Sequence, residues 1–321
     1  MVRNKKVAAK ASVLAAAAAL LLSACGGAGV DAGASSAPTG GSTEACGSYA
    51  IAMHAWVGYT ASAQVLTEIG KTLGCDVTQT TLDEGAVTYD AMEAGTVDLI
   101  VEDWGGGRWK DRADRGAVVD LGPDGNIGLI GMYVPQWMAD KYPDITDSAN
   151  LNKYADMFKT PESKGKGAWL EGPPGYTTIG EKMVSANKLN YTVLSQGSES
   201  ALIDAFTKAD KDQTAVLAYW WTPQNLLAKI KLARVKFPAN DWTDPAQASG
   251  LTDYPETVLP KLASKKLADS TDPFGRLVKN WKWTNDDQNA VAADIDGGMT
   301  PEAAAQKWIA ANADTVASWT K

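Results

Sequence analysis

Histidine and phenylalanine are scarce in this chain of 321 residues. It has one His and 4 Phe, against 12 Trp and 10 Tyr. A single His leaves little material for a His-rich metal site or for His-based nucleophilic catalysis. We therefore expect no metal site and no cofactor. Trp and Tyr carry a polar N–H or O–H that needs a partner, so this aromatic set favours rings that face a ligand, besides rings in the core.

An excess of positive charge is also missing. The chain has 30 Lys+Arg against 38 Asp+Glu, a formal net charge of −8. Nucleic-acid phosphates require a basic surface, so we expect no nucleic-acid partner. The hydrophobic content of 45% is enough for the core of one large domain or of two smaller ones.

The amino terminus lacks an apolar run long enough to cross a bilayer. Residues 13–22 are apolar, but a spanning helix takes roughly 20 residues. Basic residues precede this run, and the segment LSAC, which ends at Cys25, follows it. This pattern predicts a lipoprotein signal peptide over residues 1–24 and lipidation of Cys25. An ordinary secretory signal with a chance Cys is the alternative.

Residues 25–47 hold the lipidated Cys and small or polar residues, which predicts a flexible tether to a folded domain. The lipid anchor is the expected membrane contact, and the protein is expected at the extracytoplasmic face of the cell membrane. Export leaves Cys46 and Cys75 as a pair in an oxidising compartment, so we predict a disulfide between them. Two separate buried thiols are the alternative.

The folded part contains two β-α-β-α-β patterns, over residues 49–104 and 167–221. The predicted strands are 49–54, 77–82, 97–101, 167–170, 191–194 and 215–218, and the predicted helices are 61–73, 86–94, 177–189 and 199–209. Such alternation indicates parallel sheets with crossover helices. Residues 128–135 are apolar and extended and are expected to connect the two units. After Pro223 we expect helices, with Trp281, Trp283, Trp308 and Trp319 packed on the core.

Aromatic residues follow several of the predicted strands. They are Trp56, Trp104, Tyr176 and the run Tyr219, Trp220 and Trp221. Ligands of open parallel sheets bind outside the carboxyl ends of the strands, so these rings are expected to form a cage. A quaternary ammonium ion donates no hydrogen bond and is attracted by ring faces, which suits such a cage. Glu102 is expected to add negative potential or to bind a polar group of the ligand; capping of the next turn is the alternative.

Several segments also carry a family resemblance. They are IAMHAW (51–56), DLIVEDW (98–104), GMYVP (131–135), EGPPG (171–175), WTP (221–223) and WIAAN (308–312), together with the lipoprotein signal. In this order and spacing they resemble the glycine betaine/choline/carnitine family of ABC-transporter substrate-binding proteins, over about residues 48–321. The resemblance implies an α/β protein with the two-lobed periplasmic-binding-protein type II fold, in which two parallel-sheet lobes are joined by a hinge. We expect residues 48–130 plus 237–321 in lobe one and 131–236 in lobe two.

The resemblance also implies site residues and partners. The cage rings would fall on Trp56 or Tyr59, on Trp104, and on Trp221 with Trp220 beside it. The captured ligand would pass to an ABC permease and its ATPase subunits, and we expect a monomer. Relatives often have His where Gln224 stands, so the groups that hold the polar end of the ligand differ here. Glycine betaine, choline and carnitine-like compounds all remain candidates.

Two other functions are compatible with the sequence. A sugar-binding lipoprotein also uses Trp faces, but it would need more Asn, Asp and Gln at the strand ends than this chain offers. A surface glycan hydrolase would use Glu102, Asp103 or Glu171 as paired carboxylates. His54, the one His, lies in a predicted strand, where we expect it to be packed. We therefore predict capture of a ligand and no enzymatic activity.

Overall fold

A mixed sheet of nine strands runs through residues 45–321, the part of the chain that the structure, a computed structural model, describes. The strands are β1 (Ser48–Met53), β2 (Asp76–Thr81), β3 (Leu99–Ile100), β4 (Val118–Pro135), β5 (Gly167–Glu171), β6 (Tyr191–Ser195), β7 (Ala218–Thr222), β8 (Leu232–Val235) and β9 (Glu256–Ser264). Their order is β2-β1-β3-β9-β4-β7-β5-β6, with β8 paired to β4. The predicted signal peptide (1–24), Cys25 and the tether up to residue 44 lie outside the described residues.

Helices and short 3₁₀ turns connect the strands. The α-helices are α1 (Val57–Thr72), α2 (Ala86–Glu93), α3 (Lys110–Asp114), α4 (Gln136–Lys141), α5 (Leu151–Tyr154), α6 (Gly180–Ala186), α7 (Glu199–Asp212), α8 (Lys265–Asp269), α9 (Pro273–Asn280), α10 (Asn285–Asp296), α11 (Pro301–Ala311) and α12 (Ala313–Trp319). The 3₁₀ turns are Pro143–Thr146, Ser148–Asn150, Ala155–Phe158 and Asn225–Ala228. Ser198 caps α7 and Thr300 caps α11 through their side-chain oxygens, as such residues do before a helix.

Both predicted β-α-β-α-β units are present. β1 pairs in parallel with β2 and β3, which we call the first parallel set. β5 pairs in parallel with β6 and β7, the second parallel set. The predicted parallel pairing within each unit is therefore confirmed, and the fold is α/β. The predicted boundaries of the two lobes remain a prediction.

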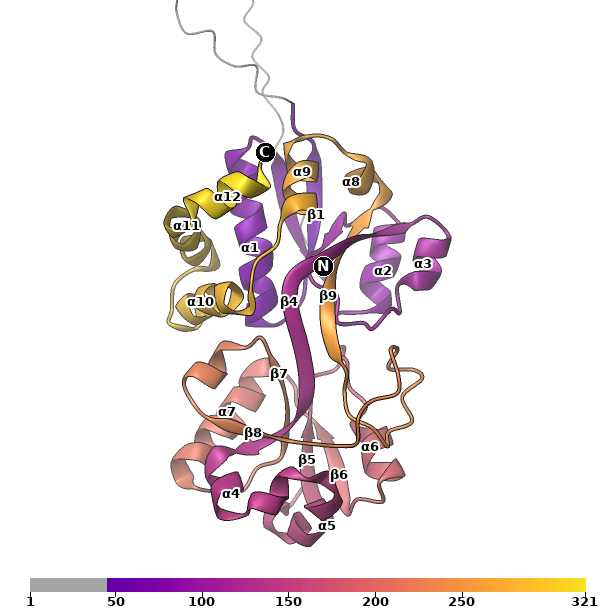
Figure 1. The fold of residues 1–321 in the computed structure, drawn as a ribbon, viewed down its shortest axis with the longest axis vertical. Helices are drawn as coiled ribbons and strands as arrows, with labels where there is room; N and C mark the ends of the chain where they lie inside the picture. Colours follow the sequence, from indigo (N-terminus) through magenta and orange to yellow (C-terminus); the bar gives the residue numbers. More distant parts are fainter. Residues whose placement is uncertain (1–44) are drawn as a thin grey trace, which may run out of the picture. The chain divides into compact units, whose positions relative to one another are not determined.

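Two antiparallel strands join the parallel sets into one sheet. β9 is antiparallel to β3, and β4 is antiparallel to β9, β7 and β8. Figure 1 shows β4 and β9 side by side along the middle, with the first parallel set above and the second below. Residues 128–135 are extended, as predicted, but they are only the end of the 18-residue strand β4.

The expectation of helices after Pro223 is confirmed only in part. The 3₁₀ turn Asn225–Ala228 comes first, but β8 and β9 follow it, and α8 begins only at Lys265. Pro260 argues against a strand on sequence grounds, but it lies opposite Pro123 where the register of β4 and β9 shifts. A proline is tolerated there because a bulge leaves ladder hydrogen bonds unmade.

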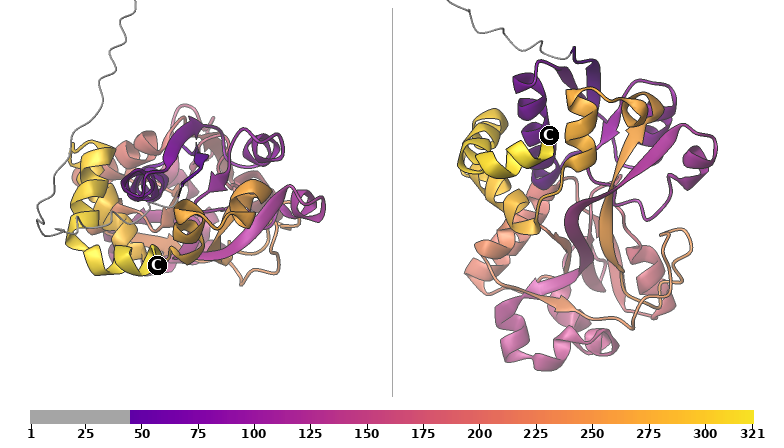
Figure 2. Two further views of the ribbon diagram at one scale, coloured as in Figure 1. Left: turned by 90° about the horizontal axis from the view of Figure 1, so that it is seen from above. Right: turned by 45° about the horizontal axis from the view of Figure 1, so that its top comes forward.

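The C-terminal helices cover α1. Both views in Figure 2 place α10 to α12 beside it. As expected, Trp281, Trp283, Trp308 and Trp319 are buried, and each ring lies within 6 Å of the next in this order: 5.5 Å, 5.7 Å and 5.8 Å between centroids. These four Trp therefore belong to the core and leave the other rings for a site.

The predicted disulfide between Cys46 and Cys75 is present in the structure. It ties the segment before β1 to the segment between α1 and β2. Gly74, the residue before Cys75, has φ +84°, the left-handed conformation in which glycine often ends a helix. The bridge and this turn fix the end of α1 that is remote from Trp56.

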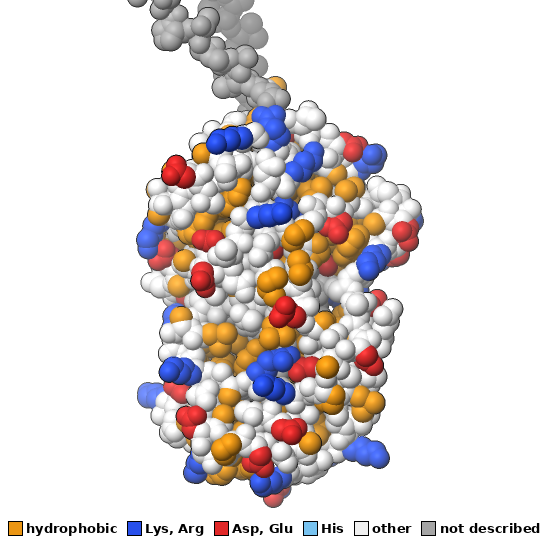
Figure 3. All heavy atoms as spheres, viewed as in Figure 1, with side chains coloured by type: hydrophobic (Ala, Val, Ile, Leu, Met, Phe, Trp, Pro, Cys, Tyr) orange, Lys and Arg blue, Asp and Glu red, His pale blue; other side chains and the backbone are white. Residues whose placement is uncertain are grey.

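Apolar side chains are exposed where β4 and β9 pair. Ile127 of β4 faces Val258 of β9, and both are exposed. Figure 3 shows apolar side chains gathered along the middle of this face.

Candidate functional site

A cavity of about 230 Å³ lies where the first and second parallel sets approach each other. Its lining consists of Trp56, Glu84, Trp104, Ile130, Tyr176, Thr177, Tyr219 and Trp221. Five of these eight residues are aromatic. Four of the predicted ligand-binding residues, Trp56, Trp104, Tyr176 and Trp221, lie in this lining.

Trp56 and Trp104, which we call the first wall, follow β1 and β3 of the first parallel set. Trp56 precedes α1, and its indole Nε1 donates to Glu102 Oε1 at 3.0 Å. Trp104 Nε1 donates to the same oxygen at 3.3 Å. Glu102 is fully buried and does not line the cavity. It thus contacts the rings of the first wall instead of the cavity.

Tyr176, Tyr219 and Trp221, the second wall, come from the second parallel set. The Tyr176 ring lies 5.7 Å from Trp221 and 6.5 Å from Tyr219, edge to face in both pairs. It also lies 5.4 Å from Trp56, so it links the two walls. The hydroxyl of Tyr219 donates to the main-chain oxygen of Thr177 at 3.2 Å. Ring contacts and main-chain acceptors hold the second wall.

β7 begins later than predicted, and this changes the role of Trp220. The strand was predicted over 215–218, but it covers Ala218–Thr222, so the aromatic run lies within it. Successive side chains of a strand point to opposite faces. Tyr219 and Trp221 line the cavity, whereas Trp220 packs at 5.5 Å against Phe206 of α7. Trp220 is fully buried and is not part of the lining.

Tyr59 also lies behind the first wall. It is fully buried on α1, 5.1 Å from the ring of Trp56, and its hydroxyl accepts from the Val101 main-chain N–H. His54 packs 4.4 Å from the Tyr59 ring. Burial lowers the pKa of His54 to about 3, so it is neutral at physiological pH. The expectation of a packed His54 is confirmed.

Glu84 is the acidic residue of the lining, and the sequence analysis missed it. It follows β2, and its side chain is 4% exposed. Its Oε1 has no hydrogen-bond partner among the described residues, and the nearest cation, Arg108 Nη2, is 3.7 Å away. Burial raises the pKa of Glu84 to about 8, because the low-dielectric surroundings penalise its charge. The rule that places ligands at strand ends would have found Glu84 if it had been applied to β2 as well.

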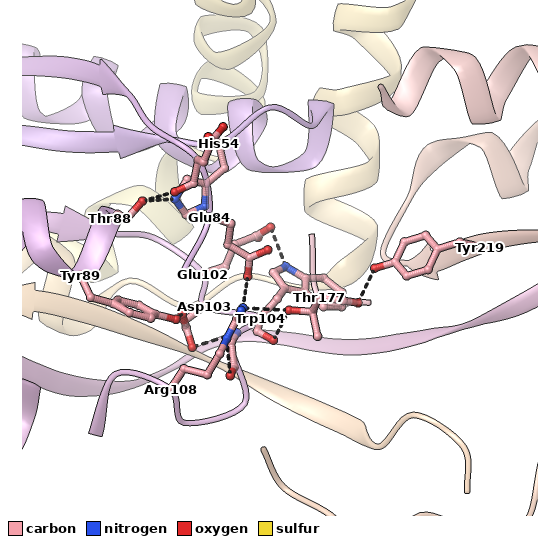
Figure 4. Close-up of polar contacts among 12 residues, drawn as sticks. His54, Glu84, Thr88, Tyr89, Glu102, Asp103, Trp104, Arg108, Thr177 and Tyr219 are labelled. Carbon is pink, nitrogen blue, oxygen red and sulfur yellow. Dashed lines mark hydrogen bonds and ion pairs between the residues drawn. The ribbon is translucent and has the colours of Figure 1, made fainter. Parts of the chain in front are cut away.

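Arg108 and Thr177 connect the walls near Glu84. Arg108 donates to the Thr177 hydroxyl at 3.1 Å, and this hydroxyl donates to the main-chain oxygen of Trp104 at 3.1 Å. Figure 4 shows this group of side chains around Trp104, with Glu102 on its indole nitrogen. Thr177 was not predicted as a site residue, whereas Tyr219 belongs to the aromatic run that was expected in the cage.

The carboxyl groups that a glycan hydrolase would use do not reach the cavity. Asp103 is bonded to the Tyr89 hydroxyl and to a main-chain N–H, and neither it nor Glu102 nor Glu171 lines the cavity. Burial raises the pKa of Asp103 to about 6 and that of Glu171 to about 7. The part of the chain that the structure describes has no group of three or more His, Cys, Asp or Glu arranged to hold a metal ion. Within residues 45–321, no helix combines the length and the apolar character that crossing a bilayer requires.

Gln224 is also outside the lining. Its Nε2 donates to Glu199 at 2.9 Å, and its Oε1 accepts from the main-chain N–H of Leu226. Glu199 in turn accepts from the main-chain N–H of Val57, the first residue of α1. Gln224 thus supports a contact between α7 and α1.

Comparison with known proteins identifies the family of the chain. The family described as the substrate-binding domain of ABC-type glycine betaine transport systems matches residues 47–311. The chain is 29% identical over 286 residues to the trimethylamine N-oxide-binding protein of Pelagibacter ubique, an alignment that covers 84% of this chain and 90% of the relative. It is 31% identical over 127 residues to the glycine betaine/carnitine transport binding protein of Listeria monocytogenes, 40% of this chain and 39% of the relative.

Solved structures show the same fold. The lactococcal OpuAC complexed with glycine betaine has a TM-score of 0.68 and 22% identity, covering 86% of this chain and 100% of the other. An ABC-transporter choline-binding protein in complex with choline has a TM-score of 0.70 and 17% identity, covering 85% and 91%. Proteins of this family bind substrates for transport and are not enzymes. The chain therefore belongs to the family of extracytoplasmic substrate-binding proteins that serve ABC-type glycine betaine transport systems.

Proposed function

We propose that this chain captures a compact ammonium compound with a fully methylated nitrogen in the aromatic cavity. The supporting observation is the lining itself: five aromatic rings and Glu84 around about 230 Å³. That figure includes space open to solvent, so the enclosed part is smaller than 230 Å³, which favours a compact ligand. A methylated ammonium donates no hydrogen bonds, and each desolvated ring face attracts it by about 2 kcal/mol.

The named ligands of similar proteins share this chemistry. Trimethylamine N-oxide, glycine betaine, carnitine and choline each carry a nitrogen with three methyl groups. They differ in the polar end, which is an oxygen on nitrogen, a carboxylate or a hydroxyl. The shared part matches the aromatic walls, so the polar end decides among these ligands.

Glu84 is the residue that would meet the polar end. Its carboxyl group lies in the lining, and its Oε1 has no hydrogen-bond partner within residues 45–321, with Arg108 Nη2 at 3.7 Å. With a pKa of about 8, it is mostly neutral at pH 7 and can donate a hydrogen bond to a ligand oxygen. Above pH 8 it is ionised and attracts the cation instead. The neutral form can therefore donate to any of the three polar ends, whereas the ionised form disfavours a ligand carboxylate.

Capture requires access to the cavity, for which we propose a hinge motion of two lobes, residues 48–130 plus 237–321 and residues 131–236. β4 and β9 connect the parallel sets and would carry the hinge. The captured ligand would then pass to the ABC permease and its ATPase. The segment LSAC ending at Cys25 supports removal of residues 1–24 and anchoring of the monomeric protein through a lipid at Cys25.

Calorimetry with the purified protein tests the ligand class. We expect binding of one or more of choline, glycine betaine, carnitine and trimethylamine N-oxide, and no binding of glucose or maltose. The variant Trp104→Ala, which lacks one ring of the cavity, should weaken the binding of every ammonium ligand. Binding of sugars together with no response to the four ammonium compounds would contradict the proposal and leave the fold unaffected.

A further inference from the structure

Glu102 is bonded to both Trp residues of the first wall, although it does not touch the cavity. Its Oε1 accepts from Trp56 at 3.0 Å and from Trp104 at 3.3 Å. An indole N–H is a donor only, so each ring needs an acceptor at its nitrogen edge. One oxygen thus fixes the edge of two rings that are separated by 48 positions in the sequence.

The second oxygen of Glu102 also accepts two hydrogen bonds. Oε2 accepts from Gln288 Nε2 of α10 at 2.5 Å and from Ser62 Oγ of α1 at 3.3 Å. The carboxyl group therefore faces four donors from three segments of the chain: the start of α1, the segment after β3, and α10. An ionised carboxylate is an acceptor at every site and matches this arrangement. Burial raises the pKa of Glu102, and the four donors act in the opposite direction.

Other buried Trp residues have no such arrangement. The indole nitrogens of Trp220, Trp281 and Trp283 are buried without a hydrogen-bond partner among the described residues. The packing of the core tolerates these unpaired N–H groups, although each one loses the hydrogen bond that it would make to water. The two cage indoles of the first wall, by contrast, share one carboxylate oxygen. A single carboxylate oxygen shared by two indoles that line the cavity points to a role in ligand recognition.

We propose that Glu102 is a positioning residue that sets the orientation of Trp56 and Trp104 and places a negative charge behind both rings. The cavity then prefers a cation to an uncharged ligand of the same shape. The proposal rests on the proposed function. Asp124 of β4 and Glu84 of the lining interact electrostatically with Glu102, Asp103 is buried next to it in the sequence, and Lys261 of β9 interacts with Asp124.

The variant Glu102→Gln separates charge from position. A Gln side chain keeps an acceptor oxygen for the two indoles and is neutral. Its amide would face Gln288, whose Oε1 is buried and unpaired and can accept once the Gln288 amide turns. Asp286→Asn is the matched control. Asp286 is exposed on α10, the helix that also carries Gln288, and its replacement changes the net charge by the same amount.

The probes are choline and glycine betaine, each paired with the isostere in which carbon replaces nitrogen: 3,3-dimethylbutan-1-ol and 3,3-dimethylbutanoate. Calorimetry should show that Glu102→Gln weakens the ammonium ligand about tenfold and leaves its isostere within about twofold. Asp286→Asn should change neither. An unchanged ratio of the two affinities in Glu102→Gln would overturn the proposal. No binding of either ammonium probe to the unmodified protein would instead contradict the proposed function.

A second measurement does not depend on the folding of the Glu102 variant. In Trp56→Phe, the oxygen of Glu102 has Trp104 as its remaining indole donor, and the reverse holds in Trp104→Phe. Removing one donor from a shared acceptor strengthens the other hydrogen bond. We expect the remaining indole N–H proton of the first wall to move downfield in NMR spectra. An unchanged resonance in both variants would show that the two rings do not share this carboxylate.

Discussion

The two walls of the cavity are held in different ways. Both rings of the first wall bond to Glu102, whereas the rings of the second wall rest on one another and on main-chain oxygens. The orientation of the first wall therefore depends on one charged side chain. That of the second wall is spread over many contacts, so single changes there should disturb it less.

Removal of a whole ring gives the largest expected effect. Trp221→Ala takes away one ring face and should weaken the binding of choline about 30-fold, which corresponds to about 2 kcal/mol. Trp104→Ala also removes a donor to Glu102 and should weaken it several times more. Calorimetry on both variants measures the difference. A larger loss of affinity in Trp221→Ala than in Trp104→Ala would show that choline binding depends more on the second wall than on the first.

Replacement of Trp by Phe sharpens the comparison, because a ring face remains. Trp104→Phe loses the hydrogen bond to Glu102, a charged acceptor, and should weaken choline binding about tenfold. The Trp221 indole makes ring contacts to Tyr176, Tyr219 and Trp220 and no side-chain hydrogen bond within residues 45–321, so Trp221→Phe should stay within about threefold. Equal losses in the two variants would show that the hydrogen bond to Glu102 contributes nothing to recognition.

Glu84 lies between the walls, and its effect should depend on pH and on the ligand. Its pKa of about 8 means that the carboxyl group ionises as the pH rises from 7 to 9. Choline should then bind several-fold more tightly and glycine betaine several-fold more weakly, because the added negative charge attracts the cation and repels the carboxylate. Glu84→Gln should remove both trends. Titrations of the two ligands at pH 7 and pH 9 check this, and parallel pH trends for both ligands would exclude Glu84 as the contact.

Reduction of the disulfide should have the smallest effect on binding. The bridge between Cys46 and Cys75 closes a loop with a sequence separation of 29, and its loss should cost about 3 kcal/mol of unfolding free energy. It holds the end of α1 opposite Trp56, so the first wall should keep its geometry. We expect a melting temperature lower by several degrees and an unchanged affinity for choline. A large loss of affinity would mean that the first wall depends on the whole of α1 and not mainly on Glu102.

Much of this site could be predicted from the sequence, because ligands of parallel sheets bind at the carboxyl ends of the strands. Trp56, Trp104 and Tyr176 come after strands whose carboxyl ends meet, and their placement needed only the β-α-β pattern. The rule failed for β7 because the aromatic run lies within this strand and not after it. Trp220 and Trp221 therefore point to opposite faces of the sheet. β9 and the first part of β4 were missed because Pro123 and Pro260 suggest breaks, which the bulges accommodate. The shared contact of Glu102 was out of reach, since it depends on segments that only the folded chain brings together.

The central claim is that the cavity is aromatic and that the negative charge of Glu102 lies behind its first wall. The most direct test compares a charged ligand with an uncharged compound of the same shape. Calorimetry of the unmodified protein should show that choline binds about 100-fold or more tightly than 3,3-dimethylbutan-1-ol, since several desolvated ring faces and Glu102 act on the charge alone. Equal affinities for the two compounds would contradict the account, because the cavity would then recognise shape and not charge.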